Sequence, residues 1–444
     1  MNKKNIAGSE PVALPSKATR DARSLPMPYT KRIIGTAYFI TGLLFLALLC
    51  FESTARAAGW DLSSNTTTTS YSSESGGLGN YAALPFLVSV SARGGYDDNV
   101  STTHINPQES AFTNVGVTLS YTFGSPRTRL DLSAGGGVTY YFENVGSDNY
   151  DTNGYLSFSL THKASPRLIL AVTAYAAYQE EPDFSLALGL NRRSGNYFYT
   201  QDKGTVTYLW TPRFSTATSY TLGVVRYDSS SIGFFEDRFE NTVGNEFRFL
   251  LWPTTTVVAE YRFEMVSYDN INRDSTTHFA LVGFDHSFNP RLDASFRGGA
   301  EFRDYDAFGK NTSPYFEGTL SYAVGKDTSV AWTNRYAIEE ADVLLNPSRT
   351  TFRTGLRAKH NFTSRISALL GAFYEHDAYD SINMPPIVSS GFNEETFDVA
   401  ISLRYAFNRY FGIEAGYAHT EVLSDVFLRE YSRNRFFGGL NLTF

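Results

Sequence analysis

One short stretch decides the fold of this chain: residues 292–303 read LDASFRGGAEFR. Apolar or small side chains occupy the even positions, and Asp, Ser, Arg and Glu occupy most of the odd ones. Successive side chains of a β-strand point to opposite faces, so this alternation predicts a strand with one apolar and one charged face. The same pattern recurs in residues 257–264 and 397–407. The chain therefore reads as a series of two-faced strands.

Tight turns separate these alternating runs from about Pro85 to Phe444. Proline presets the turn dihedral and cannot continue a central ladder, so recurring Pro-Arg pairs between β-rich runs mark hairpin reversals. The predicted turns are 124–127, 164–167, 211–213, 252–254, 289–291, 325–327, 363–365 and 408–409. Eight turns imply sixteen strands. One further run at each end, 86–96 and 430–444, raises the expected number to about eighteen, within a range of 16 to 18.

Aromatic side chains gather just before the turns, for example Phe123, Trp210 and Trp252. Such a ring is typical of the interface girdle of a membrane barrel, whereas a soluble sandwich with one wet face has no need of it. Open sheet edges are costly in hydrocarbon, so a lipid-facing sheet of this size must close. We therefore expect an all-β, transmembrane antiparallel β-barrel with short periplasmic turns and long extracellular loops. Eighteen strands enclose a lumen that is aqueous or filled by loops.

The first 57 residues read as a secretory signal peptide with a long n-region. The basic pair Lys31-Arg32 precedes the apolar segment from Ile33 to Phe51, and Ala55-Arg56-Ala57 follows it. A transmembrane anchor is the competing interpretation. Cys50, the only cysteine, lies in this segment, and the leucine before it disfavours lipid attachment. Cleavage would leave a mature chain without cysteine, which cannot be a disulfide scaffold.

The sequence therefore predicts three regions: a signal peptide at 1–57, a Ser/Thr-rich periplasmic leader at 58–84 and the barrel at 85–444. The expected location is the bacterial outer membrane. The chain is acidic, with a formal net charge of −7, which argues against a nucleic-acid partner. Outer-membrane lipid and lipopolysaccharide are the expected surroundings. The pattern leaves the oligomeric state open.

The charged strand faces are expected to line the lumen. The predicted pore-lining residues are Arg248, Glu260, Arg262, Glu264, Arg297, Glu301, Arg303, Arg353, Arg357 and Arg404. Because both signs are interleaved, either a cross-strand lattice of ion pairs or a selective surface would explain them. Both interpretations give a polar wall that suits a hydrophilic solute.

The predicted outer loops are acidic. The residues concerned are Glu180, Glu181, Asp183, Glu339, Glu340, Asp342, Glu375, Asp377, Asp380, Glu394 and Glu395. Solvated loop charge is the simplest interpretation, and a divalent-cation bridge to surface lipid phosphates is the sharper one. Two loops, Gln179–Asn196 and Glu375–Glu395, are long and contain apolar stretches. We expect one of them to fold inward and narrow the pore.

The sequence shows no arrangement of residues that is typical of a catalytic site. The seven histidines are not paired with a serine or a second carboxylate at a recognisable spacing. Metal-ligand clusters and glycine-rich phosphate loops are absent from the sequence pattern. We therefore expect no enzyme activity, no catalytic residue, no metal and no cofactor.

The last strand ends in residues that share one face: Phe436, Leu440, Leu442 and Phe444. This ending looks like the C-terminal signature that the barrel assembly machinery reads in its substrates. Near the two ends of the barrel, residues 95–100 read GYDDNV and residues 430–435 read EYSRNR. These motifs resemble the putative β-barrel porin 2 family of outer-membrane proteins, some of which are linked to exopolysaccharide export. The resemblance covers about Pro85 to Phe444.

The resemblance implies an outer-membrane pore, with a surface polysaccharide or a polysaccharide-export apparatus as a partner. It transfers no substrate-binding residue. The leading functional prediction is thus a porin-like barrel that passes hydrophilic solutes or exports a surface polysaccharide. A structural or adhesive barrel with partner-binding acidic loops is the alternative, and an enzyme at the barrel rim is a weaker one. A plugged TonB-dependent receptor would need about 22 strands and a longer leader.

Overall fold

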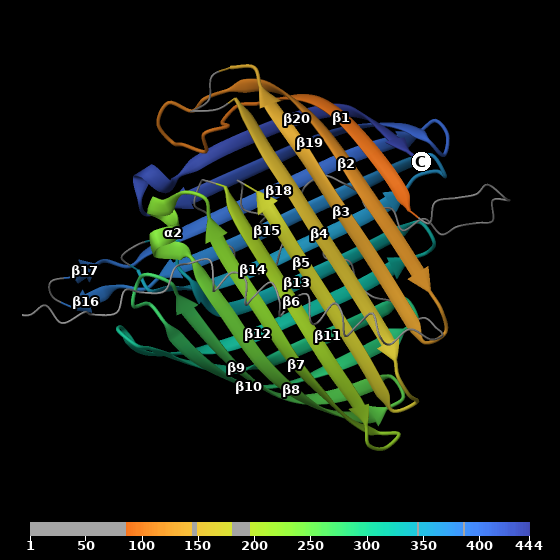
Figure 1. The fold of residues 1–444 in the computed structure, drawn as a ribbon, viewed down its shortest axis with the longest axis vertical. Coiled ribbons are helices and arrows are strands. Elements are labelled where there is room, and N and C mark those ends of the chain that lie inside the picture. The colour runs from red at the N-terminus through yellow and green to blue at the C-terminus, as the bar shows by residue number, and fades with distance from the viewer. Residues whose placement is uncertain (1–85, 144–148, 180–195, 344–345, 385–386) are drawn as a thin grey trace, which may run out of the picture. The chain divides into compact units, whose positions relative to one another are not determined.

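The computed structural model describes residues 86–444 except 144–148, 180–195, 344–345 and 385–386. Eighteen strands form one antiparallel sheet in this part of the chain (Figure 1). The first nine are β1 (Leu87–Asp97), β2 (Ser110–Gly124), β3 (Thr128–Tyr141), β4 (Tyr150–Lys163), β5 (Leu168–Gln179), β6 (Tyr197–Leu209), β7 (Phe214–Tyr227), β8 (Arg238–Trp252) and β9 (Thr255–Tyr268). The others are β10 (Ser275–Asn289), β11 (Leu292–Tyr305), β12 (Gly309–Val324), β13 (Thr328–Glu340), β14 (Ser348–Asn361), β15 (Ile366–Tyr379), β18 (Phe392–Ala406), β19 (Phe411–Ser424) and β20 (Tyr431–Thr443).

The sheet closes on itself, because β1 pairs with both β2 and β20. The closing ladder runs from the pair Ser89 and Thr443 to the pair Asp97 and Arg435. Backbone bonds between Val88 and Phe444, at 2.8 and 3.1 Å, extend it by one step. Closure satisfies the strand edges, which is the condition for a sheet in lipid. The predicted fold class, a transmembrane antiparallel β-barrel of eighteen strands, is therefore correct.

Each of the eight predicted turns joins two strands of the barrel. Several form because a turn side chain caps the reversal: the Thr211 hydroxyl accepts hydrogen bonds from the backbone N–H groups of Arg213 and Phe214, at 3.3 and 3.0 Å. The Asn408 carboxamide oxygen accepts two in the same way. Serine, threonine and asparagine favour turns through such local bonds, so this end of the barrel is encoded locally.

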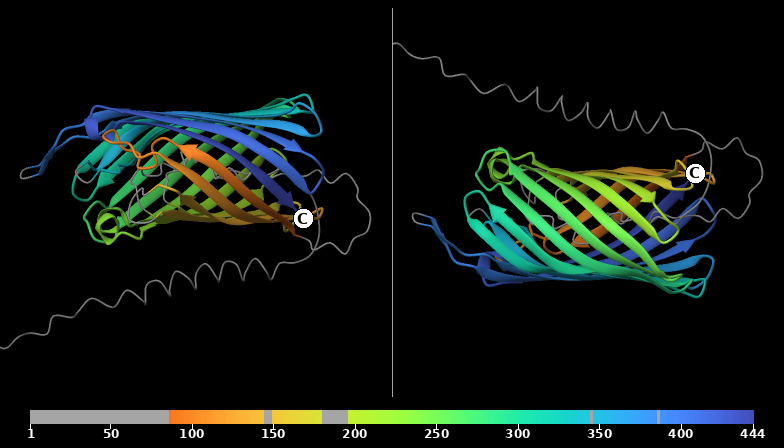
Figure 2. Two further views of the ribbon diagram at one scale, coloured as in Figure 1. Left: turned by 90° about the horizontal axis from the view of Figure 1, so that it is seen from above. Right: turned by 90° about the horizontal axis from the view of Figure 1, so that it is seen from below.

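The opposite end carries the longer connections, which include helix α2 (Ser230–Glu236) and the 3₁₀ turn η1 (Phe427–Arg429). We call this end the outer mouth. A two-stranded hairpin, β16 (Ile382–Met384) and β17 (Ile387–Ser389), pairs with no barrel strand. Both views of Figure 2 place α2 and this hairpin at the end away from the C-terminus. Within the described residues no helix is long and apolar enough to cross a membrane.

The two faces of the wall differ as the sequence predicts. On β11, Phe302 is 48% exposed on the outer face, whereas its neighbours Glu301 and Arg303 are 0% and 3% exposed. Some inward aromatic rings lie over a glycine of the next strand: a Cβ on Gly135 would lie 2.4 Å from the ring of Tyr155. Glycine thus lets the ring lie flat against the wall.

Candidate functional site: the charged wall and the outer mouth

All ten predicted pore-lining residues lie on the sheet face opposite the exposed apolar side chains. They come from β8, β9, β11, β14 and β18. Period-two alternation within each strand is sufficient to put them there. Whether they present free charge to a solute depends on their contacts with one another.

Ion pairs connect these side chains across the strands. The Arg262 guanidinium donates to Glu317 at 2.5 Å and also bonds Glu260. Arg248 lies 2.5 Å from Asp285, and Arg353 pairs with Glu375. Much of the charge on this wall is therefore compensated by neighbouring side chains, which favours the ion-pair lattice over a row of free charges.

The outer end of β13 leaves the wall. Pairing between β12 and β13 stops at Phe316 and Tyr336, although β13 continues to Glu340. Beyond that point consecutive residues are buried, including Ala337 at 0% and Ile338 at 2% exposed. A strand in a membrane wall keeps alternate residues exposed to lipid. The outer end of β13, with β14 still paired to it, therefore lies inside the barrel.

Side chains of β11 hold this inner segment. Glu301 accepts a hydrogen bond from the backbone N–H of Ile338 at 2.6 Å, and Arg303 donates to the carbonyl of Ile338 at 3.1 Å. Arg303 also bonds the Glu340 carboxylate at 2.6 Å. Apolar contacts complete the anchor, since Ala337 packs into a cluster with Phe279, Leu281 and Tyr315.

The connection between β13 and β14 is anchored from two distant parts of the rim. Arg273, between β9 and β10, donates to the Ala341 carbonyl at 2.5 Å and to the Pro347 carbonyl at 3.3 Å. Arg429, in η1 between β19 and β20, lies 2.9 Å from Asp342. The β13–β14 hairpin thus spans between these two parts of the outer mouth and narrows it.

The charges at the mouth are tightly bound. Burial alone would raise the pKa of Asp342, but the guanidinium groups of Arg429 and Arg349, with the Tyr379 hydroxyl, hold that pKa below its usual value. Glu236 of α2 is fully buried and lies 3.6 Å from Arg273. Helix α2 therefore joins the same network of charges.

For six of the acidic residues assigned to the outer loops, both interpretations given by the sequence analysis were wrong. The residues Glu339, Glu340, Asp342, Glu375, Asp377 and Glu394 are buried, and each of them forms an ion pair with an arginine of the wall or the mouth. Neither solvated loop charge nor a cation bridge to lipid phosphate describes these six residues. Five of them were placed in loops because β13, β15 and β18 extend farther than the alternation indicated, whereas Asp342 does lie in the connection after β13. Glu180, Glu181 and Asp183 lie outside the described residues.

The structure also contains a narrowing element that the sequence analysis did not name. The loop Gln179–Asn196 lies almost wholly outside the described residues, so the expectation that it narrows the pore stays a prediction. In the loop 375–395, the β16–β17 hairpin projects beyond the strand ends (Figure 1). The β13–β14 hairpin enters the barrel instead. One sequence signal could have found it: residues 279–284 read FALVGF, apolar on both faces, which suits a strand covered on its inner face as well.

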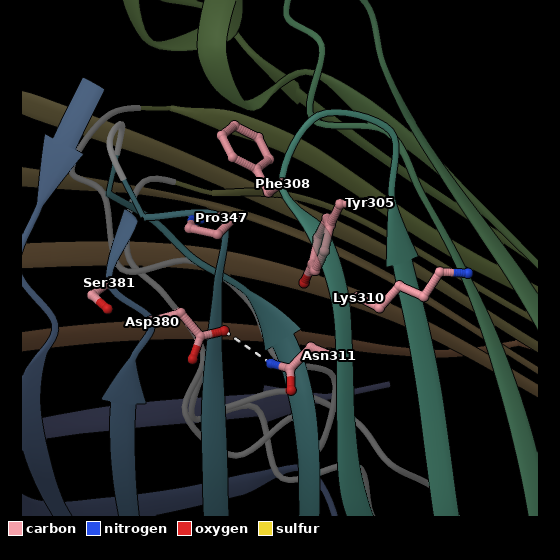
Figure 3. A pocket seen from close by; sticks show the side chains of 7 residues that line it. All are labelled: Tyr305, Phe308, Lys310, Asn311, Pro347, Asp380 and Ser381. Atoms are coloured by element: carbon pink, nitrogen blue, oxygen red, sulfur yellow. Dashed lines mark hydrogen bonds between the residues drawn. The ribbon is translucent and has the colours of Figure 1, made fainter. Parts of the chain in front are cut away.

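A cavity of about 290 Å³ opens where β12 and β13 separate. Its lining residues are Tyr305, Phe308, Lys310, Asn311, Pro347, Asp380 and Ser381 (Figure 3). Asn311 donates to Asp380 at 3.1 Å, which links the outer end of β12 to the residue that follows β15 (Figure 3). The outer end of β12 is therefore fastened directly to β15, past the displaced ends of β13 and β14.

The two motifs near the ends of the barrel meet at the closing seam. Asp97, which is 0% exposed, bonds the Arg433 guanidinium at 2.5 and 3.0 Å and Arg435 at 2.9 Å. Asp98 accepts bonds from both the backbone and the side chain of Asn434, each at 2.6 Å. The chain segments that carry the family resemblance therefore form the clasp between the first and last strands.

Three of the histidines have structural partners near the short turns. His162, His286 and His360 each bond a threonine of the neighbouring strand, at 2.9, 2.7 and 2.7 Å. His376 lies 3.7 Å from Glu395. Among the residues that the structure describes, no group of three or more His, Cys, Asp or Glu side chains could hold a metal ion.

The four residues of the C-terminal signature lie on the outer face, three in β20 and Phe444 directly after it. Phe436, Leu440, Leu442 and Phe444 are all exposed there. They are therefore accessible from the lipid side, as recognition during assembly would require.

A closed barrel with an apolar outer face and an ion-paired inner face defines a class of protein, the porin-like transmembrane β-barrels. The chain belongs to the family described as putative beta-barrel porin 2, which it matches over residues 78–444. By this description the family is one of porin-like barrels.

Solved structures give weaker likenesses. The outer membrane protein opdK from Pseudomonas aeruginosa is 10% identical, with a TM-score of 0.40, over 81% of this chain and 99% of that one. OccAB4 from Acinetobacter baumannii is 10% identical, with a TM-score of 0.38 over the same shares. No curated protein matches the chain. Since these TM-scores are low, the fold assignment rests on the strand pairing itself.

Proposed function

We propose that this chain forms a pore in the bacterial outer membrane for hydrophilic solutes and, more specifically, for the export of a surface polysaccharide. The observation that carries the proposal is the closed eighteen-strand barrel whose inner face is polar and charged. A barrel of this strand number is too wide for wall side chains alone to fill it. The family contains porin-like barrels, which supports the same function.

The ion-paired wall bears on the kind of solute. Where Arg262 and Arg248 are paired with Glu317 and Asp285, they present little net charge to a passing molecule. A paired wall still offers many hydrogen-bonding groups, and such a surface suits a hydrated, weakly charged sugar chain better than a small ion. Lipopolysaccharide around the rim, the barrel assembly machinery and an export apparatus are the proposed partners.

A structural or adhesive barrel is the second candidate, and one observation favours it. The β13–β14 hairpin is tied across the outer mouth by Arg273, Arg303 and Arg429. If the remaining passage is too narrow for solutes, the barrel would present its outer loops to a partner without conducting.

Planar-bilayer recording of the refolded protein separates the two candidates. An open pore gives stepwise conductance with weak ion selectivity, and neutral oligosaccharides added to one side reduce that conductance if sugar chains enter it. Folding is checked in the same sample by the heat-dependent mobility of the barrel in gels. Well-folded protein that never conducts would refute the pore. A pore that conducts but is blocked equally by sugars and by inert polymers of the same size would refute the polysaccharide form.

A further inference from the structure

We infer that Pro314 of β12 determines the aperture of the pore, because it ends the β12–β13 ladder and so directs the β13–β14 hairpin into the barrel. This inference rests on the proposed pore function and names one residue that sets the size limit of that pore. The evidence is the direction in which the backbone groups of β12 and β13 form hydrogen bonds.

In an antiparallel sheet, alternate residues of a strand bond to alternate neighbours. The N–H of Ala323 in β12 donates to the Arg291 carbonyl beside β11, at 2.8 Å. Odd-numbered residues of β12 therefore bond toward β11, and even-numbered residues, including Pro314, face β13. Pro314 has no N–H to donate on that side.

The partner that Pro314 would have is Ile338. The last pair of the ladder is Phe316 with Tyr336, so the next position on the β13-facing edge would match Pro314 with Ile338. On the other side of β13, the N–H of Asn361 in β14 donates to the Asp327 carbonyl at 2.7 Å. By the same alternation, Ile338 directs its backbone groups toward β12 and away from β14.

Ile338 obtains from side chains the bonds that a regular strand partner would have supplied. Its N–H donates to Glu301 at 2.6 Å, and its carbonyl accepts from Arg303 at 3.1 Å. A buried peptide with an unpaired carbonyl would be costly, and Pro314 would leave it unpaired in a continued ladder. Moving inward to the charged pair on β11 satisfies both groups. The ladder stops two residues from Pro314 for this reason.

The free edge of β12 retains the groups for a longer ladder. Continuing the register would match Thr312 with Glu340 and Lys310 with Asp342, the second pair with opposite charges. In that arrangement β13 would rejoin the wall, and the hairpin would no longer narrow the mouth. Pro314, together with the hydrogen bonds that Glu301 and Arg303 form with Ile338, thus selects the narrow arrangement.

The test replaces Pro314 and reads the ladder separately from the pore. Pro314→Val restores the N–H. The double variant Pro314→Val with Arg303→Met also removes the competing hydrogen bond from Arg303 to the Ile338 carbonyl. Thr312→Val is the matched control, because it raises strand propensity on the same edge and face without changing a backbone N–H. Amide exchange at Lys310 and Thr312 reports whether the ladder has extended, and single-channel conductance reports the aperture.

We expect these amides to exchange about tenfold more slowly in the double variant, the effect of one added hydrogen bond of roughly 1.4 kcal/mol. Conductance should rise in the double variant and stay at the wild-type value in Thr312→Val. Unchanged exchange in both Pro314 variants would refute the role of Pro314 in the ladder. Slower exchange without higher conductance would refute its control of the aperture. Amide exchange can be measured in a protein that does not conduct. A wild-type protein that folds but never conducts therefore refutes the proposed function, while the exchange rates still test the role of Pro314 in the ladder.

Discussion

The clasp between the first and last strands yields the most quantitative prediction. Asp97 is fully buried and is the carboxylate shared by Arg433 and Arg435. Asp97→Asn keeps the size of the side chain but leaves two guanidinium groups beside a neutral partner. Removing one partner of a buried ion pair costs about 3–5 kcal/mol, because the remaining charge stays buried. We expect a loss of that size in the free energy of unfolding.

A matched variant is available in Asp131→Asn. Its carboxylate lies 2.7 Å from Arg129, but both side chains are about one-third exposed. Exposed pairs contribute about 0.2–1 kcal/mol. Urea unfolding in lipid vesicles, followed by tryptophan fluorescence, compares the two variants. Asp97→Leu combined with Arg433→Met should recover part of the loss, since it removes both charges of the Asp97–Arg433 pair and leaves only the more exposed Arg435. Equal losses for Asp97→Asn and Asp131→Asn would refute the assignment of Asp97 as the buried centre of the clasp.

Three further predictions follow from other parts of the barrel. Gly135→Ala should destabilise the barrel by about 1–3 kcal/mol in the same unfolding assay, because its Cβ would lie 2.4 Å from the Tyr155 ring, whereas Gly204→Ala meets no atom within 4 Å and should not; equal effects would contradict the flat-ring packing. Phe444→Ala should slow barrel assembly in cells, measured by heat-modifiable mobility, more than Phe288→Ala, which removes a similarly exposed ring near a short turn. The lowered pKa of Asp342 means that its stabilising contribution is complete above its unfolded value of about 3.9 and is lost only as the pH falls through the lower folded value. Conductance should therefore not change through this group between pH 8 and 5, and an Asp342→Asn variant that conducts like the wild type would contradict the anchoring role.

The clasp also gives the family motifs a physical meaning. Residues 95–100 and 430–435 lie at opposite ends of the barrel sequence, yet Asp97, Asp98 and Asn99 bond residues 432–435. Closing the barrel requires the first and last strands to find one another across more than three hundred residues. Buried charges at that junction favour the correct register, since a slip would leave Asp97 without its arginines.

The sequence by itself determined the number of strands, the short turns and the faces of the wall. Strand alternation and the side-chain capping of turns act over a few residues, so the pattern around Leu292 to Arg303 predicts its own outer and inner face. The short turns were predictable for the same reason. All ten charged residues assigned to the inner face lie there.

Only the tertiary structure decided how the outer mouth is built. Pro314 is visible in the sequence, but its effect depends on the register that would match it with Ile338 in a continued ladder, and on Glu301 and Arg303 from another strand. The acidic residues near Glu340 look like loop charge until distant arginines are brought to them. Contacts between residues far apart in the chain arise from closure and register, and no local pattern records which charges will meet.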